Sequence, residues 1–329
     1  MNMMNSKWLG ASTPTQRTII TRTQIESFLQ GFPPLFRCEA SRIPFTYPIV
    51  LWQSIYVPWL PSEHDANMII HGQQSFHYIR DIQYNEELFY QIHLSNIRKK
   101  KGSQGVMCLL DCDMILTNSQ AHPILHANTT LLLLDKPESI APFSLEVPHP
   151  TSKSLLLPDL PELYDIWNQR SLLLPGSTLI DVCLGTITGD KLHAYAKASR
   201  DNNTIHLDAQ KAHEFGLPGR VAHGMLILGM IGNMLQGLQT ENMKLSGLQC
   251  RFHAPIVEGD IVYAKVNVQS VAESQLARNM KSPDESSLEN YPSIHCSLEV
   301  FIDQRNASLS FNSENKTLAY SGSARYVRV

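Results

Sequence analysis

Three polar residues in one short stretch have the types and spacing needed to move a proton. They are Asp201, Asn203 and His206. Histidine has the side-chain pKa nearest neutrality and can exchange a proton at working pH, and a nearby carboxylate can orient the imidazole or a reacting water. The run from Asp201 to Thr204 is rich in turn formers, so we expect a loop that leaves a short helix ending near Ser199. The pattern predicts an Asp/His pair on a loop.

Two helices are expected after this loop. Asp208 can cap a short helix over Ala209 to Phe215, because Asx side chains accept the free N–H groups of a first turn. A longer apolar helix is predicted from Ala222 to Leu238, and we expect His223 to orient its start. The N-terminus of a helix carries partial positive charge, and a glycine there presents its N–H with no side chain in the way. Gly224 is therefore a candidate donor to a substrate oxygen.

These two features together resemble a known motif. Asp201-x-Asn203-x-x-His206, followed by Ala222-His223-Gly224-Met225, is similar to the motif of MaoC-like dehydratases and type-2, R-specific enoyl-CoA hydratases. The chain departs from it at Arg200, where glycine is usual, and at Thr204, where proline is usual. The resemblance implies a double hotdog fold in which the C-terminal half is catalytic. The N-terminal half resembles the degraded repeat of two-repeat members, since it has no Asp-x-x-x-x-His pair ahead of its helix.

The same residues fit the chemistry of water elimination. Removing water across C2–C3 of a 3-hydroxyacyl thioester needs a base, an acid and a group that holds negative charge on the thioester oxygen. Asp201 and His206 are the candidate catalytic pair, and one oxyanion donor such as the Gly224 N–H is worth about 3–4 kcal/mol in other systems. Asn203 is expected to fix the loop or to hold the water. We expect reversible hydration of trans-2-enoyl to 3-hydroxyacyl thioesters without any cofactor, and the resemblance alone implies the R configuration.

Other interpretations stay open at this point. Residues 201–203 are also typical of an ordinary turn, and His206 would then be a surface histidine. The fold would also suit a thioesterase, and Arg200 and Thr204 leave room for a non-catalytic module that binds acyl thioesters or a partner subunit. No metal is expected, because no His-x-x-x-His pair lies on one helix face among the candidate ligands His206, Asp208, His213 and His223.

Each half of the chain has one apolar helix candidate followed by strand-like runs. The N-terminal half is predicted to form a helix over Pro48 to Leu60 and strands over Met68–Gln73, Leu88–Leu94, Val106–Leu116 and Thr129–Leu134. After the second helix, strands are predicted over Lys244–Phe252, Asp260–Val268, Ser293–Ile302 and Leu318–Val329. Residues 67–72 also echo 242–247, which indicates a duplication. The fold class is α+β: a double hotdog of two antiparallel sheets, each wrapped round a central helix, and we expect the sheets to join because each alone has too few strands to protect its edges.

Prolines mark the boundary between the halves. The predicted organisation is a flexible tail over 1–15, a degraded hotdog over 16–136, a proline-rich linker over 137–161 and a catalytic hotdog over 162–329. Because Pro58 interrupts the N-terminal helix candidate, part of the sheet's apolar face is left for an acyl pocket or for side chains that fill it. The candidate pocket residues are Trp52, Ile55, Tyr56 and Trp59.

Composition limits the partners. Hydrophobic residues make up 43% and charged residues 17%, as in a globular protein, and the net charge of −3 argues against a nucleic-acid partner. The basic run Arg98 to Lys101 is expected in a solvated hairpin loop or, alternatively, at a phosphate of a carrier molecule. The expected partner is an acyl-CoA or acyl-ACP substrate, and a homodimer is allowed. Since no signal-peptide core or membrane-length apolar run occurs, we expect a cytoplasmic protein with no membrane contact.

Overall fold

The computed structural model describes residues 6–60, 67–102, 105–135, 174–272, 293–303 and 316–328. The elements of the N-terminal half are η1 (Ser6–Trp8), β1 (Gln16–Ile19), α1 (Arg22–Leu29), η2 (Pro34–Phe36), α2 (Ile49–Trp52), β2 (Asn67–Tyr78), β3 (Glu87–Gly102), β4 (Gly105–Asn118) and β5 (Pro123–Asp135). Those of the C-terminal half are β6 (Thr178–Thr186), α4 (Gly189–Ser199), α5 (Thr204–Leu207), α6 (Ala209–Glu214), α7 (Gly224–Gly237), β7 (Met243–Phe252), β8 (Ile261–Ala272), β9 (Ser293–Asp303) and β10 (Lys316–Arg328). The predicted linker over 137–161 lies outside the described residues.

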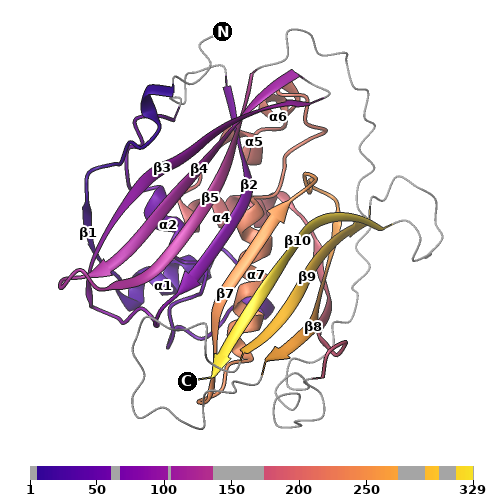
Figure 1. Ribbon diagram of the computed structural model, residues 1–329. Helices are drawn as coiled ribbons and strands as arrows, with labels where there is room; N and C mark the ends of the chain where they lie inside the picture. Colours follow the sequence, from indigo (N-terminus) through magenta and orange to yellow (C-terminus); the bar gives the residue numbers. More distant parts are fainter. Residues whose placement is uncertain are drawn as a thin grey trace.

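One antiparallel sheet runs through the whole molecule. Its ten strands follow the order β1-β3-β4-β5-β2-β7-β10-β9-β8-β6 (Figure 1). From the centre outward, the order is β2, β5, β4, β3, β1 on one side and β7, β10, β9, β8, β6 on the other. The two halves therefore repeat one topology, which agrees with the echo between residues 67–72 and 242–247.

Strands β2 and β7 join the two halves. Their antiparallel pairing runs from Gln73 opposite Arg251 to His77 opposite Gly247. The predicted joining of the sheets is thus confirmed, and the pairing covers an edge that each half alone would leave open.

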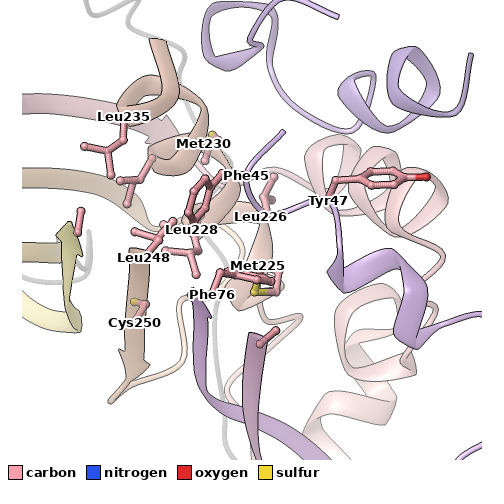
Figure 2. Close-up of a cluster of buried hydrophobic side chains, with 14 of the residues drawn as sticks. Phe45, Tyr47, Phe76, Met225, Leu226, Leu228, Met230, Leu235, Leu248 and Cys250 are labelled. Carbon is pink, nitrogen blue, oxygen red and sulfur yellow. The ribbon is translucent and has the colours of Figure 1, made fainter. Parts of the chain in front are cut away.

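Helix α7 is the buried centre of the C-terminal half. All of its residues from Met225 to Gln236 are buried, as expected of a helix that is apolar on every side. A Cβ at Gly229 would lie 2.5 Å from the Phe32 ring, so glycine permits a close contact with the N-terminal half. Figure 2 shows the core beside this helix, with Phe45, Phe76, Met225, Leu226, Leu228, Met230, Leu235, Leu248 and Cys250.

Two buried amides of α7 also bind the N-terminal half. The Gln236 side chain accepts a hydrogen bond from the Phe45 N–H at 3.1 Å and donates one to the Ile43 carbonyl at 2.9 Å. Asn233 donates to the Phe36 carbonyl at 2.9 Å. Since buried polar groups need such partners, these bonds fix how the helix sits against the loop that follows α1.

The N-terminal helix predicted over Pro48 to Leu60 is wrong in length. Helix α2 covers only Ile49–Trp52, and the chain then turns, with the Leu60 N–H bonded to the Val57 carbonyl at 3.0 Å. Pro58 disfavours helical backbone at Val57, the residue before it, but the helix already ends at Trp52, five residues earlier.

Two further predictions need correction. The flexible tail predicted over 1–15 is wrong for residues 10–13, since the Gly10 and Thr13 N–H groups bond to the Leu94 and Ile92 carbonyls of β3 at 3.0 and 2.9 Å. The basic run over 98–101 lies in β3 rather than in a loop, and Lys101 pairs with Val106 of β4. Among the described helices, none is long and apolar enough to span a bilayer.

Candidate active site

The loop that carries Asp201 begins where α4 ends. Its C-cap, Arg200, has φ of +64°, in the left-handed region. Left-handed backbone destabilises a residue other than glycine by about 1–2 kcal/mol. This cost explains why glycine is usual at this place in the related motif. The Arg200 guanidinium reaches across to the N-terminal half and donates to the Ser54 hydroxyl at 3.4 Å. The turn brings Asp201 next to the start of α7.

His206 is held in one tautomer by a backbone carbonyl. Its Nδ1 lies 2.8 Å from the Val221 carbonyl oxygen. A carbonyl can only accept, so Nδ1 carries the proton and Nε2 of the neutral ring is the acceptor. Burial lowers the pKa of His206 below its usual value, while the Asp201 charge opposes that shift. Its Nε2 is therefore free to take a proton near neutral pH.

His223 connects the loop that carries Asp201 to the start of α7. Its ring stacks on that of His206, with centroids 3.7 Å apart and planes at 26°. Its Nε2 donates to the backbone carbonyl of Asp201 at 3.0 Å, and among the described residues its Nδ1 has no hydrogen-bond partner. Burial lowers the pKa of His223 to about 3. This geometry agrees with the expected role of orienting the helix start.

Asp201, His206 and His223 form a group that could be considered as metal ligands. Their ligand atoms all lie within 4.8 Å of one another, a proximity that the linear spacing did not predict. However, stacked imidazoles place their lone pairs in nearly parallel planes, whereas a tetrahedral ion needs ligands that converge on one point. The geometry favours proton transfer, and the absence of a metal stays a prediction.

Asn203 fixes the loop. Its Oδ1 accepts from the Ile205 N–H at 3.3 Å, so that it caps α5, and its Nδ2 donates to the Ile69 carbonyl of β2 at 3.2 Å. Its own N–H bonds to the Asp201 carboxylate at 3.3 Å. Of the two roles expected for this residue, the structure favours support of the loop over contact with substrate or water.

Gly224 is the first residue of α7. The N-cap, His223, makes no side-chain capping bond, and the first N–H groups of a helix have no partner within the helix. A Cβ at Gly224 would lie 3.0 Å from the Phe252 ring, so any larger residue here would have to displace that ring slightly. The half-buried position therefore offers backbone donors at the positive end of a buried helix, next to His206.

The four predicted pocket residues differ in burial. Trp52 and Trp59 are buried in the core, and Ile55 packs against that core. Tyr56 is 81% exposed, which disfavours a place in an enclosed acyl pocket. The burial of the two tryptophans agrees with the alternative that they fill the space themselves.

One residue of the site was not predicted. His71 of β2 is half-buried, and burial lowers its pKa to about 4, with the Asp201 charge acting against this shift and His206 adding to it. Its imidazole therefore lies within electrostatic range of the pair. Only the pairing of β2 with the C-terminal half brings it there, and no local motif indicates this.

Family models match both halves of the chain. The MaoC-like domain matches residues 179–290, and the FAS1-like dehydratase domain region matches residues 7–127. The mitochondrial 3-hydroxyacyl-[acyl-carrier-protein] dehydratase of Arabidopsis thaliana is 26% identical over 106 residues, which is 32% of this chain. That match spans 62% of the length of the Arabidopsis protein.

Solved structures share the fold over nearly the whole chain. A MaoC-like dehydratase is similar with a TM-score of 0.65 at 14% identity, covering 98% of this chain and 99% of that one. A MaoC-like dehydratase from Phytophthora capsici gives 0.58 at 14% identity and covers 99% of both chains. A Mycobacterium tuberculosis protein described as a double hotdog fold gives 0.61 at 11% identity, covering 98% of this chain and 96% of that one. The chain thus carries a FAS1-like dehydratase region in its N-terminal half and a MaoC-like domain in its C-terminal half, on the fold of double hotdog proteins.

Proposed function

We propose that this protein catalyses the reversible hydration of trans-2-enoyl thioesters to R-3-hydroxyacyl thioesters. One observation carries the proposal: a neutral imidazole, His206, has its Nε2 left as acceptor beside the Asp201 carboxylate and the uncapped start of α7. That arrangement combines a base, a countercharge and an oxyanion donor.

In the dehydration direction, His206 carries one proton through the reaction. Its Nε2 takes the C2 proton, the C2 electron pair forms the C2–C3 double bond, and the hydroxyl leaves C3. The imidazolium then gives its proton to the departing hydroxyl, which completes a water molecule and returns His206 to its neutral form. The Asp201 charge, which favours protonated His206, stabilises the imidazolium formed in between.

Negative charge develops on the thioester oxygen while the C2 proton is removed. The Gly224 N–H is the proposed donor to this oxygen, because it lies at the positive end of α7 and no side-chain capping bond occupies the helix start. Loss of one such donor costs about 10²–10³-fold in turnover in other enzymes. Asn203 supports the reaction indirectly by holding the loop between Asp201 and His206.

The carrier of the acyl chain is proposed to be acyl carrier protein or coenzyme A. The Arabidopsis relative acts, by its name, on an acyl-carrier-protein thioester. The test is a hydration assay that follows loss of enoyl absorbance over thioesters differing in chain length and carrier, with the double variant Asp201→Asn/His206→Gln as control. Loss of absorbance with formation of the R-3-hydroxy product supports the proposal. Thiol release with no absorbance change would indicate a thioesterase, and binding without either reaction would indicate a non-catalytic module.

A further inference from the structure

The N-terminal half contributes an imidazole to the site through an irregularity in β2. The register of β2 against β5 shifts between His71, which faces Leu131, and Gln73, which faces Thr130. The bulged residue between them is Gly72. A bulge redirects a neighbouring side chain and is often found next to an active site. His71 is the residue that this bulge places near the C-terminal half.

A buried chain of hydrogen bonds fixes the His71 ring. Gln74 is fully buried, and its Nε2 donates to the Ser75 carbonyl at 2.9 Å, which identifies Oε1 as its acceptor. That oxygen accepts from the Thr129 hydroxyl at 2.8 Å and lies 3.1 Å from Nε2 of His71. His71 Nε2 must therefore carry a proton, and in the neutral ring Nδ1 is the acceptor.

Contacts place this ring at the edge of the proposed site. His71 meets the Phe252 ring edge to face, with centroids 5.1 Å apart, and Phe252 is the ring that lies against Gly224. Asn203, on the loop that carries Asp201, bonds to the Ile69 carbonyl, two residues before His71. The charges of Asp201 and His206 act on His71, yet it is not part of the group whose ligand atoms lie within 4.8 Å of one another. His71 therefore lies outside that group but within electrostatic range of Asp201 and His206.

We infer that His71 binds the reacting oxygen: its Nδ1 accepts a hydrogen bond from the 3-hydroxyl of the substrate or, in hydration, from the attacking water. This inference rests on the proposed function. A water that donates one hydrogen to His206 Nε2 and the other to His71 Nδ1 keeps a lone pair free for C3. The N-terminal half then orients the nucleophile while the C-terminal half moves the proton.

Three substitutions separate this role from a structural one. His71→Asn keeps a polar atom where Nδ1 lies, His71→Gln keeps one where Nε2 meets Gln74, and His71→Phe keeps only the ring. We expect His71→Gln and His71→Phe to lower kcat about tenfold, the value of one hydrogen bond of about 1.4 kcal/mol, and His71→Asn to recover most of it. His77→Asn, an exposed histidine of the same strand, is the matched control and should match the wild type.

Binding gives a readout that needs no turnover. The probes are two thioether analogues of acyl-CoA, one with and one without a 3-hydroxyl, titrated by calorimetry into each full-length variant. We expect His71→Phe to weaken the hydroxylated probe about tenfold and to leave the other unchanged. Equal weakening of both probes, no weakening, or recovery by His71→Gln rather than His71→Asn would overturn the inference while leaving the hydratase proposal in place. A wild type that neither hydrates enoyl thioesters nor binds either probe would overturn both.

Discussion

The imidazole of His206 lies flat against that of His223, with ring centroids 3.7 Å apart. Each ring is held in one tautomer by a backbone carbonyl, that of Val221 for His206 and that of Asp201 for His223. The proximity of His206 also lowers the pKa of His223. Because two positive charges at this distance repel, the stack accepts one proton at most near neutral pH, and Asp201 is the charge that stabilises it.

Loss of either member of the proposed catalytic pair, Asp201 or His206, should remove most turnover. Asp201→Asn and His206→Gln are each expected to lower kcat by about 10²–10⁴-fold. The double variant should be little worse than either single one, because groups that act as a unit are not additive. Steady-state assays with the best enoyl thioester test this, with the exposed His213→Gln as control. Additive losses would show that the two residues act separately.

His223 should matter more for stability than for chemistry. His223→Phe keeps a ring against His206 but removes the bond to the Asp201 carbonyl. We expect the free energy of unfolding to fall by about 1–2 kcal/mol, with kcat within about threefold of the wild type. Urea denaturation and steady-state kinetics measure the two effects. A loss of kcat as large as that of His206→Gln would place His223 among the reacting groups.

The acid limb of the pH profile should report His206. Because burial lowers its pKa, kcat/KM is expected to hold as the pH falls below about 6.5, the ordinary histidine value, before it drops. The Asp201 charge raises that pKa, so the residual activity of Asp201→Asn should drop at a still lower pH. An upward shift of the limb in Asp201→Asn would contradict this assignment.

Stability should decrease in acid. Burial lowers the pKa values of His71, His206 and His223 in the folded protein. Below about pH 6.5 the unfolded chain therefore binds more protons than the folded chain does. The free energy of unfolding should therefore fall from about pH 6.5 down to the pKa of His223, about 3, and the contribution of His71 should end near its own pKa, about 4. His71→Phe should reduce this slope by up to one proton, about 1.4 kcal/mol per pH unit. Urea titrations at several pH values test this, and an unchanged slope would show that His71 titrates alike in both states.

At Arg200, whose backbone is left-handed, glycine should leave the stability of the protein nearly unchanged and a β-branched residue should lower it. Arg200→Gly removes the strain at φ of +64° but adds freedom to the unfolded chain, so the free energy of unfolding should change by less than about 1 kcal/mol. Arg200→Val should lower it by more than about 1 kcal/mol, because a β-branched residue strongly disfavours that conformation. Thermal and urea melts compare the two variants. Equal effects would mean that the Ser54 contact, and not the backbone, sets the cost.

Local patterns predicted the C-terminal half well. The helix expected from Ala222 to Leu238 is α7, Gly224–Gly237, and the strand expected over Lys244 to Phe252 is β7, Met243–Phe252. Asp208 caps α6 by accepting from the Gln210 and Lys211 N–H groups. These features depend on periodicity and on side chains that bond within a few residues, and such information is present in a single segment.

Features that depend on contacts between distant parts of the chain could not be predicted from the sequence. Strand β1 has only four residues and gains its partner from β3, far along the chain. Strand β3 continues through Lys99 and Lys100, where charged residues had suggested a loop, because its pairing with β4 supplies the hydrogen bonds. His71 comes near Asp201 only when the two halves are joined, and a bulge then decides where its ring lies. No pattern within one segment encodes such a position.

The pairing of β2 with β7 has a consequence for how the site survives dilution. An interface between two separate hotdog chains dissociates as the protein concentration falls, and an active site at that interface is then lost. Here the partner strand is on the same polypeptide, so its local concentration is set by the intervening chain rather than by the amount of protein. The hydrogen bond from Asn203 to the Ile69 carbonyl, which links the two halves, is intramolecular for the same reason. Specific activity should therefore stay constant at concentrations where a two-chain version of this fold would come apart.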